Sequence, residues 1–193
     1  MNKRLLLYIH GFQSSPQSLK AIQLKEYCEH HHPDIKLVIP QLPYYPQEAA
    51  DVLKRIVEEH QAHYQIGVVG SSLGGFLSIW LQNKYSLPLV AINPAITPHL
   101  LLKDFLGEQT NPYTQDVFLL KAAHIDELKA LRVNELPLPN KAWLLQQEGD
   151  EVLNYHEAVD YFHLAKNTIE PDGNHSFIGF ERFLPSIISF LYH

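Results

Sequence analysis

One serine in this chain lies between two glycines in a segment that predicts a sharp turn. Residues 70–74 read GSSLG; a short apolar run precedes them and a helix-like stretch follows. A strand, a tight turn and a helix in this order project the central serine at a strained backbone angle and leave no room for side chains on either side. Gly70 and Gly74 satisfy this requirement around Ser72, whereas Ser71 has larger neighbours at the corresponding positions. Ser72 is therefore the predicted nucleophile.

A serine hydroxyl is a poor nucleophile at neutral pH unless a base accepts its proton, and a histidine oriented by a carboxylate can do so. In a parallel sheet, the loops after the strands gather along one edge, so residues that are distant in the sequence meet there. Asp150 follows a predicted strand at residues 142–147, and His175 follows a shorter predicted strand at residues 167–170. The sequence therefore predicts Ser72, Asp150 and His175 as catalytic residues, with Glu148 as the main alternative to Asp150.

Two main-chain amides are expected to stabilise the negative charge that develops on a carbonyl oxygen. The amide of Leu73 comes directly after Ser72, and the amide of Phe12 lies in the loop after the first predicted strand. Gly11 allows this loop to approach closely. His10 is expected to organise the loop through hydrogen bonds rather than to act as a second base.

The elements that must position these residues are predicted from hydrophobic periodicity. Short apolar runs alternate with longer amphipathic stretches, which is typical of a parallel sheet with helices on both faces. The predicted strands are residues 4–9, 36–40, 65–70, 89–93, 142–147 and 167–170. The predicted helices are residues 18–30, 47–63, 73–85, 154–162 and 177–192. The fold class is therefore α/β with a mainly parallel six-stranded sheet, and the 193 residues fit a single domain, 1–193.

Residues 94–139 form a longer connection than compact domains usually have, and such connections are often lids or binding elements. Helical patterns around residues 99–106 and 115–131 predict that this insertion is a small helical cap. A second unusual segment, residues 40–46, is too rich in proline for a helix or a central strand. Tyr44 and Tyr45 in this segment either line a substrate pocket or pack on the edge of the sheet, and the sequence favours neither.

Composition excludes several classes of protein. The net charge of −6 argues against a nucleic-acid partner, and no apolar run approaches the length needed to span a membrane. Cys28 is the only cysteine, so an internal disulfide is excluded, and a cytoplasmic location is the simplest expectation. Cys28 is expected to be a small buried hydrophobic residue. The adjacent histidines at 30–32 are not expected to form a metal site, because neighbouring residues of a helix point in different directions. We expect no metal or organic cofactor, and a monomer or homodimer.

Over nearly its whole length the sequence resembles the YqiA-type esterases of the α/β-hydrolase superfamily. The resemblance rests on the segments LYIHGF (7–12), SSP (14–16), PQLP (40–43), GVVGSSLGG (67–75), NPA (93–95), NPYT (111–114), WLLQQEGDEV (143–152) and GNH (173–175). It implies a compact α/β-hydrolase fold and hydrolysis of small or modest-chain carboxylic esters through an acyl-enzyme, with Ser72, His175 and Asp150 in the catalytic roles. Hydrolysis of acyl-CoA thioesters, and ligand binding by a hydrolase-like shell without turnover, are the alternatives.

Overall fold

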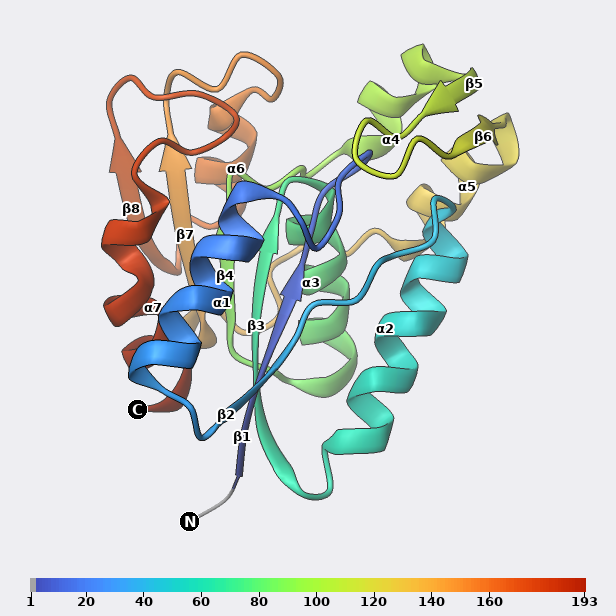
Figure 1. Ribbon diagram of the computed structural model, residues 1–193. Coiled ribbons are helices and arrows are strands. Elements are labelled where there is room, and N and C mark those ends of the chain that lie inside the picture. Colours follow the sequence, from blue (N-terminus) through green and yellow to red (C-terminus); the bar gives the residue numbers. More distant parts are fainter. Residues whose placement is uncertain (1–2) are drawn as a thin grey trace.

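The computed structural model describes residues 3–193, and at its centre lies a sheet of six parallel strands in the order β2-β1-β3-β4-β7-β8. The strands are β1 (Lys3–Ile9), β2 (Ile35–Val38), β3 (Tyr64–Ser71), β4 (Leu89–Ile92), β7 (Ala142–Gln147) and β8 (Lys166–Glu170). The predicted six-stranded sheet is therefore confirmed. Because all strands run in the same direction, their carboxyl ends meet along the upper edge of the sheet in Figure 1.

Helices cover both faces of this sheet, as predicted (Figure 1). They are α1 (Leu19–His31), α2 (Pro46–His60), α3 (Leu73–Tyr85), α6 (Tyr155–Tyr161) and α7 (Leu184–Tyr192). Side chains of β1 alternate between the two faces: Leu5 and Leu7 pack with residues of α2 and α3, and Leu6 packs with residues of α1 and α7. Burial on both sides explains why the central strands are almost continuously apolar. Within residues 3–193, no helix has the length and apolar character needed to cross a membrane.

The last helix begins later than predicted. Residues 177–192 were expected to form one helix, but Phe180–Phe183 form a short 3-10 helix and α7 starts at Leu184. Pro185 lies in the first turn of α7, where its missing N–H costs no hydrogen bond, and this residue is favourable at a helix start but not in a helix interior.

Residues 94–139 contain a hairpin as well as helices. The elements are α4 (Pro98–Leu102), a 3-10 helix (Lys103–Phe105), β5 (Gly107–Thr110), β6 (Val117–Leu120) and α5 (Ala122–Leu131). The predicted helix at 115–131 is thus wrong over its first part, because Phe118 and Leu120 are buried whereas Val117 and Leu119 are exposed, which is the two-residue period of a strand. The hairpin, α4 and α5 lie beside the carboxyl ends of β1 and β3 (Figure 1).

Candidate active site

Ser72 lies in the turn between β3 and α3, at the carboxyl end of the sheet. Its φ of 56° and ψ of −121° are a strained combination for a residue with a side chain. A Cβ on Gly70 would overlap the Ser78 hydroxyl and the Gly74 carbonyl, and a Cβ on Gly74 would overlap the Ile9 carbonyl. Close contact between β1, β3 and α3 therefore requires both glycines and allows the turn to present Ser72.

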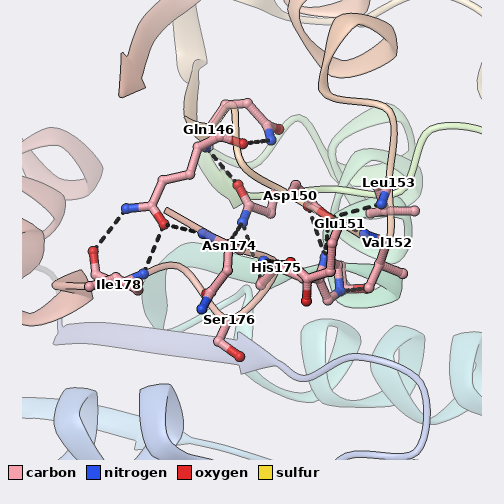
Figure 2. A network of polar contacts seen from close by, with 12 residues as sticks. Gln146, Asp150, Glu151, Val152, Leu153, Asn174, His175, Ser176 and Ile178 are labelled. Atoms are coloured by element: carbon pink, nitrogen blue, oxygen red, sulfur yellow. Dashed lines mark hydrogen bonds and ion pairs between the residues drawn. The ribbon is translucent and has the colours of Figure 1, made fainter. Parts of the chain in front are cut away.

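The structure brings together the three side chains that the sequence predicted. The Nε2 atom of His175 lies 3.1 Å from the Oγ atom of Ser72, and its Nδ1 atom lies 2.8 Å and 3.0 Å from the two carboxylate oxygens of Asp150. The loop that carries His175 follows β8 and lies beside the turn after β7 that carries Asp150 (Figure 2). In this arrangement the histidine ring can accept the hydroxyl proton while the carboxylate accepts a hydrogen bond from Nδ1–H.

The carboxylate of Asp150 is fully buried and is satisfied by several donors. Its Oδ1 atom accepts hydrogen bonds from the main-chain N–H groups of Val152 (2.9 Å) and Leu153 (2.8 Å), in addition to the histidine ring. These donors offset the loss of hydration on burial. Glu148, the alternative acid, is exposed, and its main-chain N–H donates to the carbonyl of Glu170. Asp150 is thus the carboxylate that reaches the ring of His175.

A second carboxylate holds the main chain of the histidine loop. The Oε2 atom of Glu151 accepts a hydrogen bond of 2.9 Å from the main-chain N–H of His175. This hydrogen bond lowers the pKa of Glu151, because it favours the ionised form. Sequence analysis assigned no role to Glu151, so its contact with the histidine loop was missed.

Two buried amide side chains also fix this loop. The Nδ2 atom of Asn93 donates to the carbonyls of Asn174 (2.9 Å) and His175 (3.3 Å), and its Oδ1 atom accepts from the main-chain N–H of Gln147 (2.9 Å). The side chain of Gln147 accepts from the N–H groups of Asn174 and Ile178 and donates to the Ile178 carbonyl. Sequence reasoning assigned no role to either amide. The available signal was a polar residue at the end of a buried strand, because such a residue must find partners.

Replacing Gln147 with leucine is expected to lower the free energy of unfolding by about 2–4 kcal/mol, because the main-chain groups of Asn174 and Ile178 would lose their partners in a partly buried site. The freed loop should position His175 less well, so kcat should fall about tenfold or more, with a smaller change in KM. Urea denaturation and ester hydrolysis measure the two effects. The matched control is Gln61→Leu, at an exposed position after α2, and equal values for the two variants would contradict the role of Gln147.

The two amides predicted to bind a developing oxyanion lie at the same place. Phe12 and Leu73 line one pocket together with Ser72. Within residues 3–193, neither main-chain N–H donates a hydrogen bond to another main-chain group. A Cβ on Gly11 would lie 3.1 Å from the Ser72 Cβ atom, which shows how closely the loop after β1 approaches the serine.

His10 connects two loops. Its Nδ1 atom lies 3.0 Å from the Gly11 carbonyl, and the main-chain N–H of Leu42 donates to its Nε2 atom over 3.3 Å. This pair of partners requires a neutral ring with the proton on Nδ1, and burial lowers the pKa of His10 accordingly. Both ring nitrogens are engaged, so the geometry matches the predicted organising role and leaves His10 no free nitrogen to act as a base.

Two pockets open at Ser72 and His175. The first, which we call the apolar pocket, has a volume of about 200 Å³ and is lined mainly by hydrocarbon side chains, among them Leu101, Leu102, Phe105 and Val152. The second, which we call the polar pocket, has a volume of about 280 Å³, and its lining includes Ser14, Ser18, Lys20, Tyr113 and Ser176. If the carbonyl of an ester lies at Ser72, its acyl half and its alcohol half could therefore each enter one of the two pockets.

Tyr44 and Tyr45 pack on the segment 107–131. The Tyr44 hydroxyl donates to Asp116 (2.7 Å) and its ring stacks on Phe118 at 4.3 Å, whereas the Tyr45 ring stacks on His124 at 4.1 Å. Neither tyrosine lines the apolar or the polar pocket. Both tyrosines also line a small cavity of about 30 Å³ together with Gly11, Phe12 and Leu73. The structure therefore shows packing on the segment 107–131, not on the edge of the sheet, and it leaves a pocket-lining role open.

The remaining candidate groups lie outside this site. Cys28 is buried on α1, and burial raises the pKa of its thiol to about 11, so its thiolate is scarce at neutral pH. Within residues 3–193, no three histidine, cysteine or carboxylate side chains are grouped closely enough to hold a metal ion.

Solved structures resemble this chain over nearly its whole length. Est1E from Butyrivibrio proteoclasticus with bound ferulic acid has a TM-score of 0.76 at 14% identity, covering 97% of this chain and 87% of Est1E. Mouse alpha/beta hydrolase domain-containing protein 10 has a TM-score of 0.75 at 16% identity, covering 96% and 88%. A structure of the metagenome-derived lipolytic enzymes LipS and LipT has a TM-score of 0.71 at 17% identity, covering 98% and 94%. The chain thus has the α/β-hydrolase fold.

A family model gives the narrower assignment. The model described as "Uncharacterised protein family (UPF0227)" matches residues 5–192. The chain therefore belongs to this family, and the resemblance to the YqiA-type members of the superfamily is confirmed.

Proposed function

We propose that this chain is a serine hydrolase that cleaves small or modest-chain carboxylic esters through an acyl-enzyme. The observation that carries the proposal is the continuous hydrogen-bonded path from Ser72 Oγ through the ring of His175 to the buried carboxylate of Asp150. In the sequence, His175 lies 25 positions after Asp150 and 103 positions after Ser72. Selection for a function explains such a convergence better than packing does, because packing does not require a base next to a strained serine.

The geometry supports two chemical half-reactions. Ser72 attacks the ester carbonyl while His175 accepts its proton, and the N–H groups of Phe12 and Leu73 stabilise the oxyanion. His175 then gives the proton to the leaving alcohol, and the acyl group remains on Ser72. Water activated by the same ring releases the acid and restores the serine. Asp150 keeps the ring in the tautomer that each step needs.

Pocket size supports a substrate of limited length. At about 200 Å³, the apolar pocket is smaller than the range of about 300–1,000 Å³ typical of sites that enclose drug-sized ligands. A short acyl chain beside Leu101 and Phe105 would fill it. The carbonyl of an acyl-CoA thioester would meet the same catalytic groups, so only the leaving group distinguishes that substrate class.

Turnover of p-nitrophenyl acetate and p-nitrophenyl butyrate by the purified protein is the expected result, with covalent labelling of Ser72 by a fluorophosphonate probe. Mass spectrometry of the labelled protein identifies the modified residue, and heat-denatured protein serves as the control. A series of acyl-CoAs of increasing length then compares thioesters with esters. A native protein that neither hydrolyses these esters nor labels at Ser72 would favour ligand binding without turnover.

A further inference from the structure

The polar pocket is built around the N-terminus of α1. This helix has 13 residues, and it begins near the carboxyl ends of the strands (Figure 1). Ser18, Leu19 and Lys20, which form its start, all line the pocket. The first turn contains no acidic residue that would neutralise the positive end of the helix dipole. A helix start of this kind attracts anions.

Several donors at this helix start have no protein partner. The hydroxyl of Ser18 is buried with the Tyr8 hydroxyl as a neighbour, but it makes no hydrogen bond of good geometry within residues 3–193, although Ser18 occupies the position that usually caps the helix. Ser18 itself is only 9% exposed. In the same part of the chain, the N–H groups of residues 19–21 have no main-chain acceptor. Buried polar groups without partners cost stability, so a group retained in this state next to a reactive serine indicates a ligand.

Lys20 adds a positive charge to the same pocket. Among the residues that line the polar and apolar pockets, it is the one lysine or arginine. Its ammonium donates to the carbonyl of Ser176 over 2.8 Å, which leaves further N–H donors for a second partner. Burial lowers the pKa of Lys20 to about 8, with the charge of Asp150 acting in the opposite direction, so the side chain is mostly protonated at pH 7.

We propose that the polar pocket binds an anionic group of the substrate, a carboxylate or a phosphate, through the Lys20 ammonium, the Ser18 hydroxyl and the first-turn N–H groups of α1. The inference rests on the proposed function, because an ester carbonyl at Ser72 would place one half of the substrate in each pocket. The substrate class is then an ester with one short apolar half and one anionic half. Charge-assisted hydrogen bonds of this kind are stronger than neutral ones, so the anionic group contributes to selectivity.

The test compares kcat/KM for related esters with and without an anionic group. Para-butyryloxybenzoate and para-butyryloxyphenyl phosphate carry the anion on the alcohol half, and the methyl ester of para-butyryloxybenzoate is the neutral control. The p-nitrophenyl monoester of glutaric acid carries the anionic group on the acid half, and p-nitrophenyl butyrate is its neutral control. Lys20→Met should reduce the ratio of charged to neutral kcat/KM about tenfold or more for at least one pair. Lys20→Arg should keep most of that ratio.

Lys25→Met is the matched control, because Lys25 lies on the same helix, pairs with Glu29 and lines neither pocket at Ser72. It should leave the ratio unchanged. Equal losses on charged and neutral esters in Lys20→Met would mean that Lys20 acts only through Ser176, and would overturn the anion site. An unchanged ratio in Lys20→Met for every pair would overturn it as well.

Failure of this inference is distinguishable from failure of the proposed function. If no ester is hydrolysed in a manner that depends on Ser72, the proposed function fails. Calorimetry of para-butyryloxybenzoate binding to the Ser72→Ala protein then tests the pocket by itself. Binding weakened about tenfold when Lys20→Met is added supports the anion site, and binding that does not depend on Lys20 rejects it.

Discussion

Replacing Ser72 with alanine is expected to lower kcat/KM for p-nitrophenyl butyrate by at least about ten-thousand-fold. The variant lacks the oxygen that forms the acyl-enzyme, so His175 has no hydroxyl to deprotonate at 3.1 Å from its Nε2 atom. The residual rate would come from oxyanion binding and substrate orientation alone. Alanine keeps the Cβ atom of the turn, so the fold and its strained backbone angle should persist.

Initial-rate measurements on both proteins, together with a thermal unfolding curve for each, decide this prediction. The control is Ser186→Ala, at an exposed serine on α7, which should hydrolyse the ester at the wild-type rate. If Ser72→Ala and the wild-type protein had similar rates, the nucleophile would be a different group and the proposed mechanism would be wrong.

Replacing Asp150 with asparagine is expected to reduce kcat by about a thousandfold to ten-thousandfold, with little change in KM. The amide oxygen of asparagine can still accept from the N–H groups of Val152 and Leu153. Its NH₂ group would then face Nδ1 of His175 as a donor, which forces the ring proton onto Nε2. In that tautomer the ring presents a proton, rather than a lone pair, to the hydroxyl of Ser72, and it can no longer act as the base.

Glu148→Gln is the matched control for this variant, because Glu148 was the other carboxylate that the sequence offered and it lies exposed two positions away. It should retain wild-type kcat. Steady-state kinetics with p-nitrophenyl butyrate separate kcat from KM for both variants. A large loss in Glu148→Gln combined with normal activity in Asp150→Asn would assign the orienting role to Glu148 instead.

The places of Ser72, Asp150 and His175 could be predicted because a parallel sheet gathers its strand ends. The ends of β3 and β7 were visible as the limits of apolar runs, whereas β8 has one apolar residue, Ile169, and was predicted from a shorter segment. Local sequence also specified the elbow, since only glycine fits at 70 and 74. These features depend on residues close together in the sequence, or on a rule of topology that holds for all such sheets.

Features that depend on long-range contacts could not be predicted in the same way. Residues 117–120 are apolar throughout, so their helical or extended state is decided by the pairing with β5 and by what Phe118 and Leu120 pack against. The roles of Asn93 and Gln147 depend on the conformation of a loop that begins more than 20 residues after Gln147. Periodicity carries no information about such partners.

Strand order has a consequence for how the catalytic arrangement would be lost. Ser72 follows β3, which has neighbours on both sides, whereas His175 follows β8, an edge strand whose residues are all exposed or only partly buried. Opening of such a peripheral strand costs less free energy than global unfolding. The histidine would therefore separate from the serine while the middle of the sheet remains folded, so enzymatic activity would report on the integrity of the β8 border and not on that of the whole molecule.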